Sequence, residues 1–127
     1  MILILTDDMG VGDLSCYGGQ VLPTPHLDQM AREGILFTQY YSASSICSPS
    51  RVGITTGSHP ARWQITSYLQ TRKGNKACEQ ADFLTLQAPS MAKLLKASGY
   101  KTAHFGKWHM GGRRDVTNAP KNQSIWF

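Results

Sequence analysis

Cys47 and Arg51 are the residues with the clearest capacity for chemistry, and they lie about one helical turn apart in the stretch 47–51. Pro49, between them, suits the first turn of a helix, where its missing N–H costs nothing. The spacing predicts that Cys47 lies at or just before a helix N-terminus, where unpaired N–H groups and the helix dipole favour negative charge. Arg51 can then turn back and hold a tetrahedral anion through two parallel hydrogen bonds. The stretch therefore predicts a nucleophile beside an anion-binding group.

Lys107 and His109 form a second candidate pair, because residues two apart on an extended segment share one face. Together they would place a fixed cation and a titratable imidazole beside the same anion. Trp108 would point the other way and pack as scaffold. Taken alone, a pair of this kind is most often part of a solvated loop. His104 lies inside the preceding expected strand and is interpreted as a packed histidine, not as a catalytic one.

Asp7 and Asp8 directly follow a short apolar run, residues 2–5, that is typical of a strand covered on both faces. In open α/β sheets ligands bind beyond the carboxyl ends of the strands, so both acids lie where a site would form. Two adjacent hard carboxylates suit Ca²⁺ or Mg²⁺ better than a softer metal. Turn or cap chemistry is the alternative, and without the other two motifs it would be favoured.

The expected elements alternate between strand and helix. Strands are predicted over residues 2–5, 35–41 and 101–105, and helices over residues 24–34 and 90–99. Strand, helix and strand within about forty residues argue for a parallel βαβ unit. The pattern predicts the α/β class, with a mostly parallel sheet flanked by helices.

The two expected helices carry end signals and apolar stripes. In the first, Thr24 is the expected N-cap, Pro25 the first helical residue and Gly34 the stop. The apolar stripe of the first helix is formed by Leu27, Met30 and Ala31. In the second helix, which begins at Ser90 and closes at Gly99, the residues expected to face inward are Met91, Leu94 and Leu95.

The stretches between these elements carry weaker signals. His59 follows the expected nucleophile helix, and a structural turn role is favoured for it over one in a pocket. Residues 64–86 are interpreted as an irregular loop region, which in an enzyme would be a place to encode substrate choice. The basic clusters at residues 72–73 and 113–114 are interpreted as solvated loops.

Composition indicates one soluble globular domain, with 127 residues of which 41% are hydrophobic and 17% charged. A net charge of +5 is compatible with an anionic substrate, but no aromatic-interleaved basic stripe points to nucleic acid. No apolar run approaches the roughly 20 residues of a membrane helix, and the N-terminus has no signal-peptide pattern. Cys16 and Cys78 could pair in an oxidising compartment or remain free thiols.

Residues 47–51, with Thr56 and Gly57 downstream, resemble the first signature of the sulfatases. Residues 99–111 match the second signature of that family nearly throughout, and residues 2–10 resemble the strand that delivers its paired metal-binding aspartates. Three matches in the family's order are hard to obtain by chance. The resemblance, to formylglycine-dependent enzymes of the arylsulfatase type, implies an alkaline-phosphatase-like α/β fold, incomplete in this chain.

The resemblance also implies a reaction, the hydrolysis of a sulfate monoester. A maturation enzyme would oxidise Cys47 to formylglycine, whose hydrate supplies the nucleophilic hydroxyl. Asp7, Asp8 and the modified Cys47 would hold a divalent cation, Ca²⁺ in preference to Mg²⁺. Arg51 would fix the diol and the metal shell, and Lys107 would bind sulfate charge. His109 would assist the proton transfer that releases sulfate.

By the same resemblance the partners would be a sulfated small molecule or sulfated sugar and the maturation enzyme, with no nucleic acid and no membrane span. The compartment would be secreted, periplasmic or lysosomal. The resemblance leaves open which sulfate ester is the substrate.

The family takes further metal ligands, another histidine and another lysine from later in its domain. Residues 1–127 are therefore expected to be the N-terminal part of the catalytic domain, beginning inside the first strand and ending in mid-fold at the apolar residues 125–127. We expect weak metal binding and little or no turnover from this segment alone. Two alternatives stay open: a phosphonate or phosphate ester hydrolase of the same superfamily, and a non-catalytic, truncated anion-binding remnant.

Overall fold

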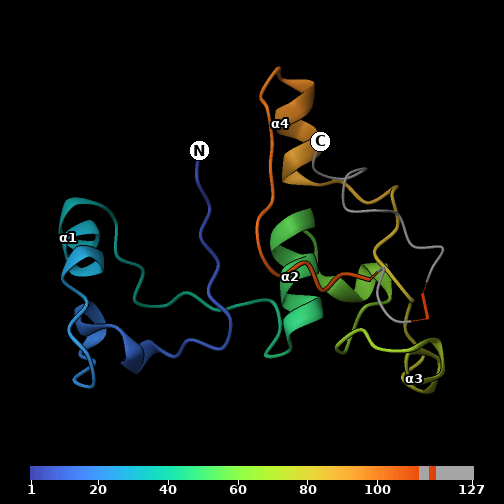
Figure 1. Cartoon of the computed structure of the whole chain (residues 1–127), viewed down its shortest axis with the longest axis horizontal. Helices are drawn as coiled ribbons and strands as arrows, with labels where there is room; N and C mark the ends of the chain where they lie inside the picture. Colours follow the sequence, from blue (N-terminus) through green and yellow to red (C-terminus); the bar gives the residue numbers. More distant parts are fainter. Residues whose placement is uncertain (112–114, 117–127) are drawn as a thin grey trace. The chain divides into compact units, whose positions relative to one another are not determined.

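The computed structural model describes residues 1–111 and 115–116, which fall into two compact units (Figure 1). The first unit is Met1–Tyr41 and the second is Ser42–Phe127. Asp7 and Asp8 belong to the first unit, whereas Cys47, Arg51 and the 107–109 stretch belong to the second. Each unit is described by itself. The second unit carries most of the candidate chemistry.

The first unit contains the short 3-10 helices η1 (Val11–Asp13) and η2 (Ser15–Tyr17) and the helix α1 (Pro25–Glu33). The end signals of α1 are confirmed, with Thr24 as N-cap and Gly34 as C-cap. The Thr24 hydroxyl does not cap a helix N–H and instead donates to Asp28 Oδ1 over 3.0 Å. The Ser15 hydroxyl also donates to Asp28, and this hydrogen bond is the main cause that lowers the pKa of the carboxyl group. Together these side chains tie η2 to the first turn of α1.

The expected apolar stripe of α1 is not buried. Leu27 and Met30 are exposed and Ala31 is half-buried, so no core covers this stripe in the described first unit. An apolar stripe is buried only where another element packs against it, and the stripe does not itself provide that element.

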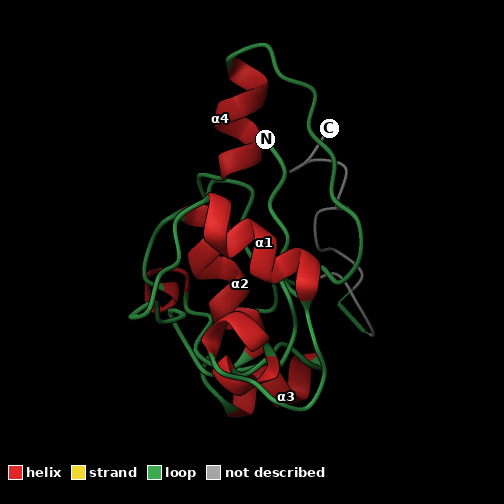
Figure 2. Ribbon diagram, turned by 90° about the vertical axis from the view of Figure 1, so that its left-hand side faces the viewer, coloured by secondary structure: helices red, strands yellow, loops and turns green. Residues whose placement is uncertain are grey.

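The second unit contains α2 (Cys47–Thr56), the 3-10 helix η3 (Pro60–Trp63), α3 (Arg72–Ala77) and α4 (Met91–Ala97). Its core joins residues from α2 and from several loops, and Figure 2 shows how much of the backbone between the helices is loop. The buried members are Val52, Ile65, Leu69, Leu84, Ala88, Trp108 and Met110. Because α2 and the 108–110 stretch both contribute to this core, burial holds the two signature segments in one unit.

No described residue forms a β-strand (Figure 2). The strands predicted over residues 2–5, 35–41 and 101–105 are therefore not observed in this structure, and neither is the parallel sheet in the part that is described. A strand exists only where a neighbour completes its hydrogen-bond ladder, and these segments have no such neighbour here. Their apolar side chains lie in solvent, with Ile2 87%, Ile35 81% and Phe105 91% exposed.

The second predicted helix forms as α4, and Ser90 caps it by accepting a hydrogen bond from Lys93 N–H. Gly99 follows the helix with φ +86°, a conformation that favours glycine. The inward face differs from the prediction, because Ala92 is buried whereas Leu94 is exposed. None of the helices in the described residues is long and apolar enough to cross a membrane.

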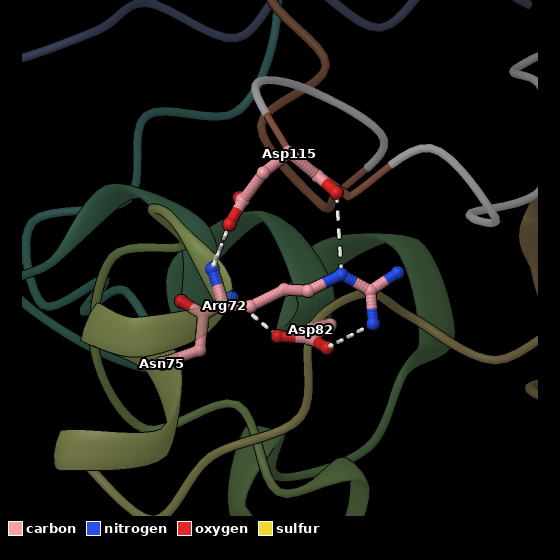
Figure 3. A network of polar contacts seen from close by, with 4 residues as sticks. All are labelled: Arg72, Asn75, Asp82 and Asp115. Atoms are coloured by element: carbon pink, nitrogen blue, oxygen red, sulfur yellow. Dashed lines mark hydrogen bonds and ion pairs between the residues drawn. The ribbon is translucent and has the colours of Figure 1, made fainter.

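Residues 64–86 do not form the irregular loop that was predicted over their whole length. They include the helix α3 and a network of polar contacts (Figure 3). Arg72 N–H lies 3.0 Å from Asp115 Oδ1, and Arg72 Nε donates to the Asp115 carbonyl over 3.2 Å. The Arg72 guanidinium also pairs with Asp82 at 3.6 Å, and Asp82 accepts from Asn75 Nδ2 at 2.9 Å. Residues 72–73 lie in the helix α3, so the prediction of a loop is wrong for them, whereas both are exposed to solvent as predicted. The cluster at residues 113–114 lies outside the described residues.

Truncating the core should cost far more stability than the same truncation on the surface. Ile65 is fully buried, so Ile65→Ala should lower the free energy of unfolding by about 2–5 kcal/mol. Ile35→Ala, the matched control at an exposed isoleucine, should change it by about 0.5 kcal/mol or less. Urea denaturation followed by tryptophan fluorescence measures both values. Equal losses in the two variants would contradict the assignment of the core.

Candidate active site

Cys47 is the first residue of α2, which confirms the predicted position of this thiol at a helix N-terminus. Ile46 is the N-cap in an extended conformation, and its carbonyl accepts the first helical hydrogen bond from Ser50 N–H at 3.0 Å. Cys47 and Cys16 are half-buried and Cys78 is exposed, and all three are free cysteines. The helix N-terminus places backbone N–H groups beside position 47, so a negative charge that develops there is favoured.

Gly53 lets the chain that leads into Cys47 pack closely on α2. A Cβ added at Gly53 would lie 2.7 Å from the Ala43 Cβ, closer than real Cβ atoms approach. Glycine thus allows the 42–46 segment to lie against the helix one turn and a half after the thiol. This contact fixes the direction from which the chain enters the site.

Arg51 connects the nucleophile helix to the second signature. Its side chain is buried, and Nη1 donates a hydrogen bond to the Lys107 carbonyl at 2.6 Å. A buried guanidinium needs hydrogen-bond partners, and a charged donor makes this bond a strong one. Arg51 therefore orders the backbone next to Lys107 and His109 and keeps a positive charge in the same region.

The stretch 107–109 has no regular secondary structure, and its three side chains differ in burial. Lys107 is exposed, Trp108 is 4% exposed and His109 is half-buried. The prediction that Trp108 packs as scaffold is confirmed by its place in the core. His109 has φ +50°, a left-handed conformation that is uncommon outside glycine, so the alternation of an extended segment is broken at this residue. Its Nε2 lies 3.2 Å from the Leu69 carbonyl oxygen.

His104 packs edge-on against Trp108, with ring centroids 5.7 Å apart and an interplanar angle of 76°. Its pKa is lowered, first because burial disfavours the charged imidazolium and second because of the positive charge of Arg51. A hydrogen bond with the Lys107 backbone opposes this shift. His104 is thus the packed histidine that its position in the sequence suggested. His59 likewise serves a turn, since its Nδ1 accepts from Ala61 N–H at 3.3 Å.

Asp7 and Asp8 lie exposed at a bend in the first unit, and Asp8 has φ +59°. Two adjacent carboxylates are hard oxygen ligands and so fit the chemistry of Ca²⁺, which takes six to eight oxygens. Within the described ranges, 1–111 and 115–116, no group of three or more His, Cys, Asp or Glu side chains is gathered as a metal site. The pair therefore fits a cation as part of a ligand set and not as the whole of it.

Leu69 and Ser48 are site residues that sequence reasoning missed. The Leu69 N–H donates to Ser48 Oγ at 2.9 Å, and the Leu69 carbonyl faces His109. Leu69 takes part through backbone atoms, which any residue type would present, so no sequence signal marks it. Ser48 lies inside the first signature, where the adjacent Cys47 is the stronger chemical signal.

Comparison with known proteins shows what this chain is similar to. The family model described as Sulfatase matches residues 1–124. The chain is 43% identical to a steryl-sulfatase of Mus musculus over an alignment of 116 positions, which covers 87% of this chain and 18% of that protein. It is 40% identical to an arylsulfatase H of Canis lupus familiaris, covering 98% of this chain and 23% of that protein. It is 39% identical to an N-acetylgalactosamine-6-O-sulfatase of Bacteroides thetaiotaomicron, covering 100% of this chain and 25% of that protein.

His104 should titrate below its ordinary pKa of 6.5 in the folded chain. The unfolded chain then binds the proton more readily, so the stability that His104 contributes is complete above about pH 6.5. It is lost as the pH falls through the lowered pKa. NMR titration of the His104 ring measures the midpoint, and His104→Gln should flatten this part of the pH–stability curve. A midpoint at or above 6.5 would contradict the environment described for this ring.

Proposed function

Because this chain belongs to the sulfatase family, we propose that it forms the nucleophile-bearing, N-terminal part of the catalytic domain of a sulfuric ester hydrolase. The observation that carries the proposal is the hydrogen bond from Arg51 to the Lys107 carbonyl, which joins the two signature segments in one unit. The chain spans about a fifth of the length of the relatives it matches, 18–25%. The activity proposed is therefore that of the whole enzyme, and residues 1–127 alone should show little turnover.

The exposed apolar segments support a larger fold. Ile2, Ile35 and Phe105 stand in three segments whose side chains are largely in solvent. An exposed apolar surface of this extent is typical of a surface that packs against another protein segment. We propose that these segments pair as strands of an alkaline-phosphatase-like parallel sheet in the whole enzyme, with the site at the carboxyl ends of the strands.

The residues of the second unit have separate roles in the proposed reaction. The side chain at position 47, matured from Cys47 to formylglycine and hydrated, supplies the hydroxyl that attacks sulfur. The bond from sulfur to the alcohol oxygen of the substrate breaks, and the alcohol leaves. Arg51 orients this group and holds positive charge beside it, since its guanidinium is anchored on the Lys107 carbonyl. Lys107 is exposed and carries the charge that binds the sulfate oxygens. His109 takes the proton from the second hydroxyl at position 47, so that the aldehyde re-forms as the bond from its carbon to the sulfate oxygen breaks and sulfate leaves.

Asp7 and Asp8 are the proposed cation ligands in this chain, together with the matured position 47. Ca²⁺ is preferred because two adjacent carboxylates are hard, flexible ligands, and Mg²⁺ is the second choice. When bound, the ion would act as a Lewis acid on the sulfate and lower the pKa of the nucleophilic hydroxyl.

The proposed substrate class is a sulfated small molecule or a sulfated sugar. The relatives are named for steryl, aryl and N-acetylgalactosamine sulfates. The similarity therefore supports a sulfate monoester as the substrate class, and it does not favour one particular alcohol as the group that carries the sulfate. A formylglycine-generating maturation enzyme is the proposed protein partner, and a secreted, periplasmic or lysosomal compartment is the proposed location.

The first experiment is an intact mass spectrum of the protein from its native host, combined with hydrolysis of an aryl sulfate. We expect a mass deficit that maps to position 47, and aryl sulfate turnover that Cys47→Ala lowers by at least about a thousandfold. Cys78→Ala, at an exposed free cysteine, is the matched control and should leave both unchanged. An unmodified Cys47 thiol in a protein without turnover would contradict the proposal and favour an anion-binding remnant. Faster turnover of a phosphonate ester would assign the related esterase activity instead.

Calcium should stabilise the protein through Asp7 and Asp8. At about 10 mM Ca²⁺, a site with a Kd of about 10⁻⁴ M raises the free energy of unfolding by about 2.7 kcal/mol. Asp7→Asn or Asp8→Asn should remove most of this gain in thermal denaturation with and without the ion. Glu33→Gln, which removes one negative charge elsewhere in the first unit, should retain it. A gain that survives both aspartate variants would refute the assignment of these ligands.

A further inference from the structure

The Leu69 peptide contacts both signature segments of the second unit. Its N–H donates to Ser48 Oγ at 2.9 Å, and its carbonyl oxygen lies 3.2 Å from His109 Nε2. Ser48 is 0% exposed and is the residue after Cys47 on α2. One residue of an intervening loop thus joins the neighbour of the nucleophile to the histidine of the second signature.

The contact to Leu69 selects one tautomer of His109. A carbonyl oxygen can only accept a hydrogen bond, so Nε2 carries the proton in this contact. In the neutral ring Nδ1 is then the nitrogen without a proton, and it is the nitrogen that can take one up. A hydrogen bond at one ring nitrogen commonly sets the role of the other in this way.

Buried amide side chains hold the segment around Leu69 in place. Gln80 accepts from Ser67 N–H at 3.0 Å and donates to the Tyr68 carbonyl at 3.1 Å. Asn75, which is fully buried, accepts from Gln70 N–H at 2.9 Å. These contacts supply partners on both sides of Leu69 in the absence of a strand ladder, so the Leu69 peptide has a defined orientation.

We propose that Ser48 is a positioning residue for His109 and acts through the Leu69 peptide. The Ser48 hydroxyl orients the Leu69 peptide plane, and the Leu69 carbonyl holds the His109 ring with its proton on Nε2. The contribution to turnover rests on the role proposed for His109 in sulfate release. The tautomer and the orientation of the ring do not depend on that role.

The test begins with the ¹⁵N-labelled chain at about pH 8.5, well above the ordinary pKa of imidazole. Long-range ¹H–¹⁵N spectra report which nitrogen of His109 carries the proton. We expect Nε2–H in the unaltered chain. Ser48→Ala should give a mixture of the two tautomers and speed hydrogen exchange of the Leu69 amide by about tenfold or more. Ser48→Thr, which keeps the hydroxyl, should restore both readouts.

Thr56→Val is the matched control. The Thr56 hydroxyl donates to the Val52 carbonyl at 2.8 Å inside the same helix, and it has no part in the Leu69 contacts. Its loss should lower stability and leave the His109 tautomer unchanged. Equal effects of Thr56→Val and Ser48→Ala on the tautomer would overturn the proposal, because both would then reflect general loosening of α2. An Nδ1–H tautomer in the unaltered chain would overturn it without any variant, even if Ser48→Ala does not fold.

A kinetic experiment on the mature whole enzyme separates this inference from the proposed function. Ser48→Ala should lower kcat for an aryl sulfate by about tenfold or more with little change in KM, and displace the pH–rate profile, whereas Ser48→Thr should retain both. An active enzyme whose kcat and pH profile are unchanged by Ser48→Ala would overturn the positioning role. Absence of turnover in the unaltered enzyme would count against the proposed function alone, since the tautomer measurement decides the positioning contact.

Discussion

The hydrogen bond from the Arg51 guanidinium to the Lys107 carbonyl is the contact on which the arrangement of the second unit depends. It joins residues 56 positions apart and lies beside a core to which α2 contributes Val52 and the second signature contributes Trp108. A buried guanidinium without partners would be costly, so this bond constrains where residue 107 can lie. The same positive charge contributes to the lowered pKa of His104. One interaction thus orders the backbone and sets the local electrostatics.

In this unit side chains supply hydrogen bonds to backbone groups that neighbouring strands would supply in a sheet. Gln80 bonds the Ser67 N–H and the Tyr68 carbonyl, and Asn75 accepts from the Gln70 N–H. Asn75 in turn donates to Asp82, which pairs with Arg72 (Figure 3). Because amide groups both donate and accept, two such residues can complete the hydrogen bonds of an irregular segment. The cost is that each buried amide must be fully satisfied. This explains why a segment without regular structure can present the Leu69 carbonyl in a defined direction.

Local signals predicted the helices well and the strands poorly. Pro25 at the first helical position and Gly34 at the C-cap specify the ends of α1 locally, and Pro49 suits the first turn of α2, which begins at Cys47. The segments at 2–5, 35–41 and 101–105 have strand-like composition, but a strand needs a partner distant in sequence, and none pairs with them in the described residues. Leu94 was predicted to face inward on α4 but is exposed, because the apolar character of a residue does not by itself determine which side of a helix is covered. The short helix α3 begins with Arg-Lys-Gly and was missed for lack of any apolar period.

The amino-acid sequence by itself determined the family, through three motifs in a fixed order, and it determined the helix ends and the position of Cys47 at a helix N-terminus. Those features depend on residue types at short spacing, which are visible in a chain without its fold. Only the tertiary structure decided that Arg51 bonds the Lys107 carbonyl, that Arg72 meets Asp115 and that Leu69 lies between Ser48 and His109. Each of these contacts uses a backbone group or joins residues that are far apart in sequence. A backbone group carries no residue-type signature, so its partner is decided only when the chain packs.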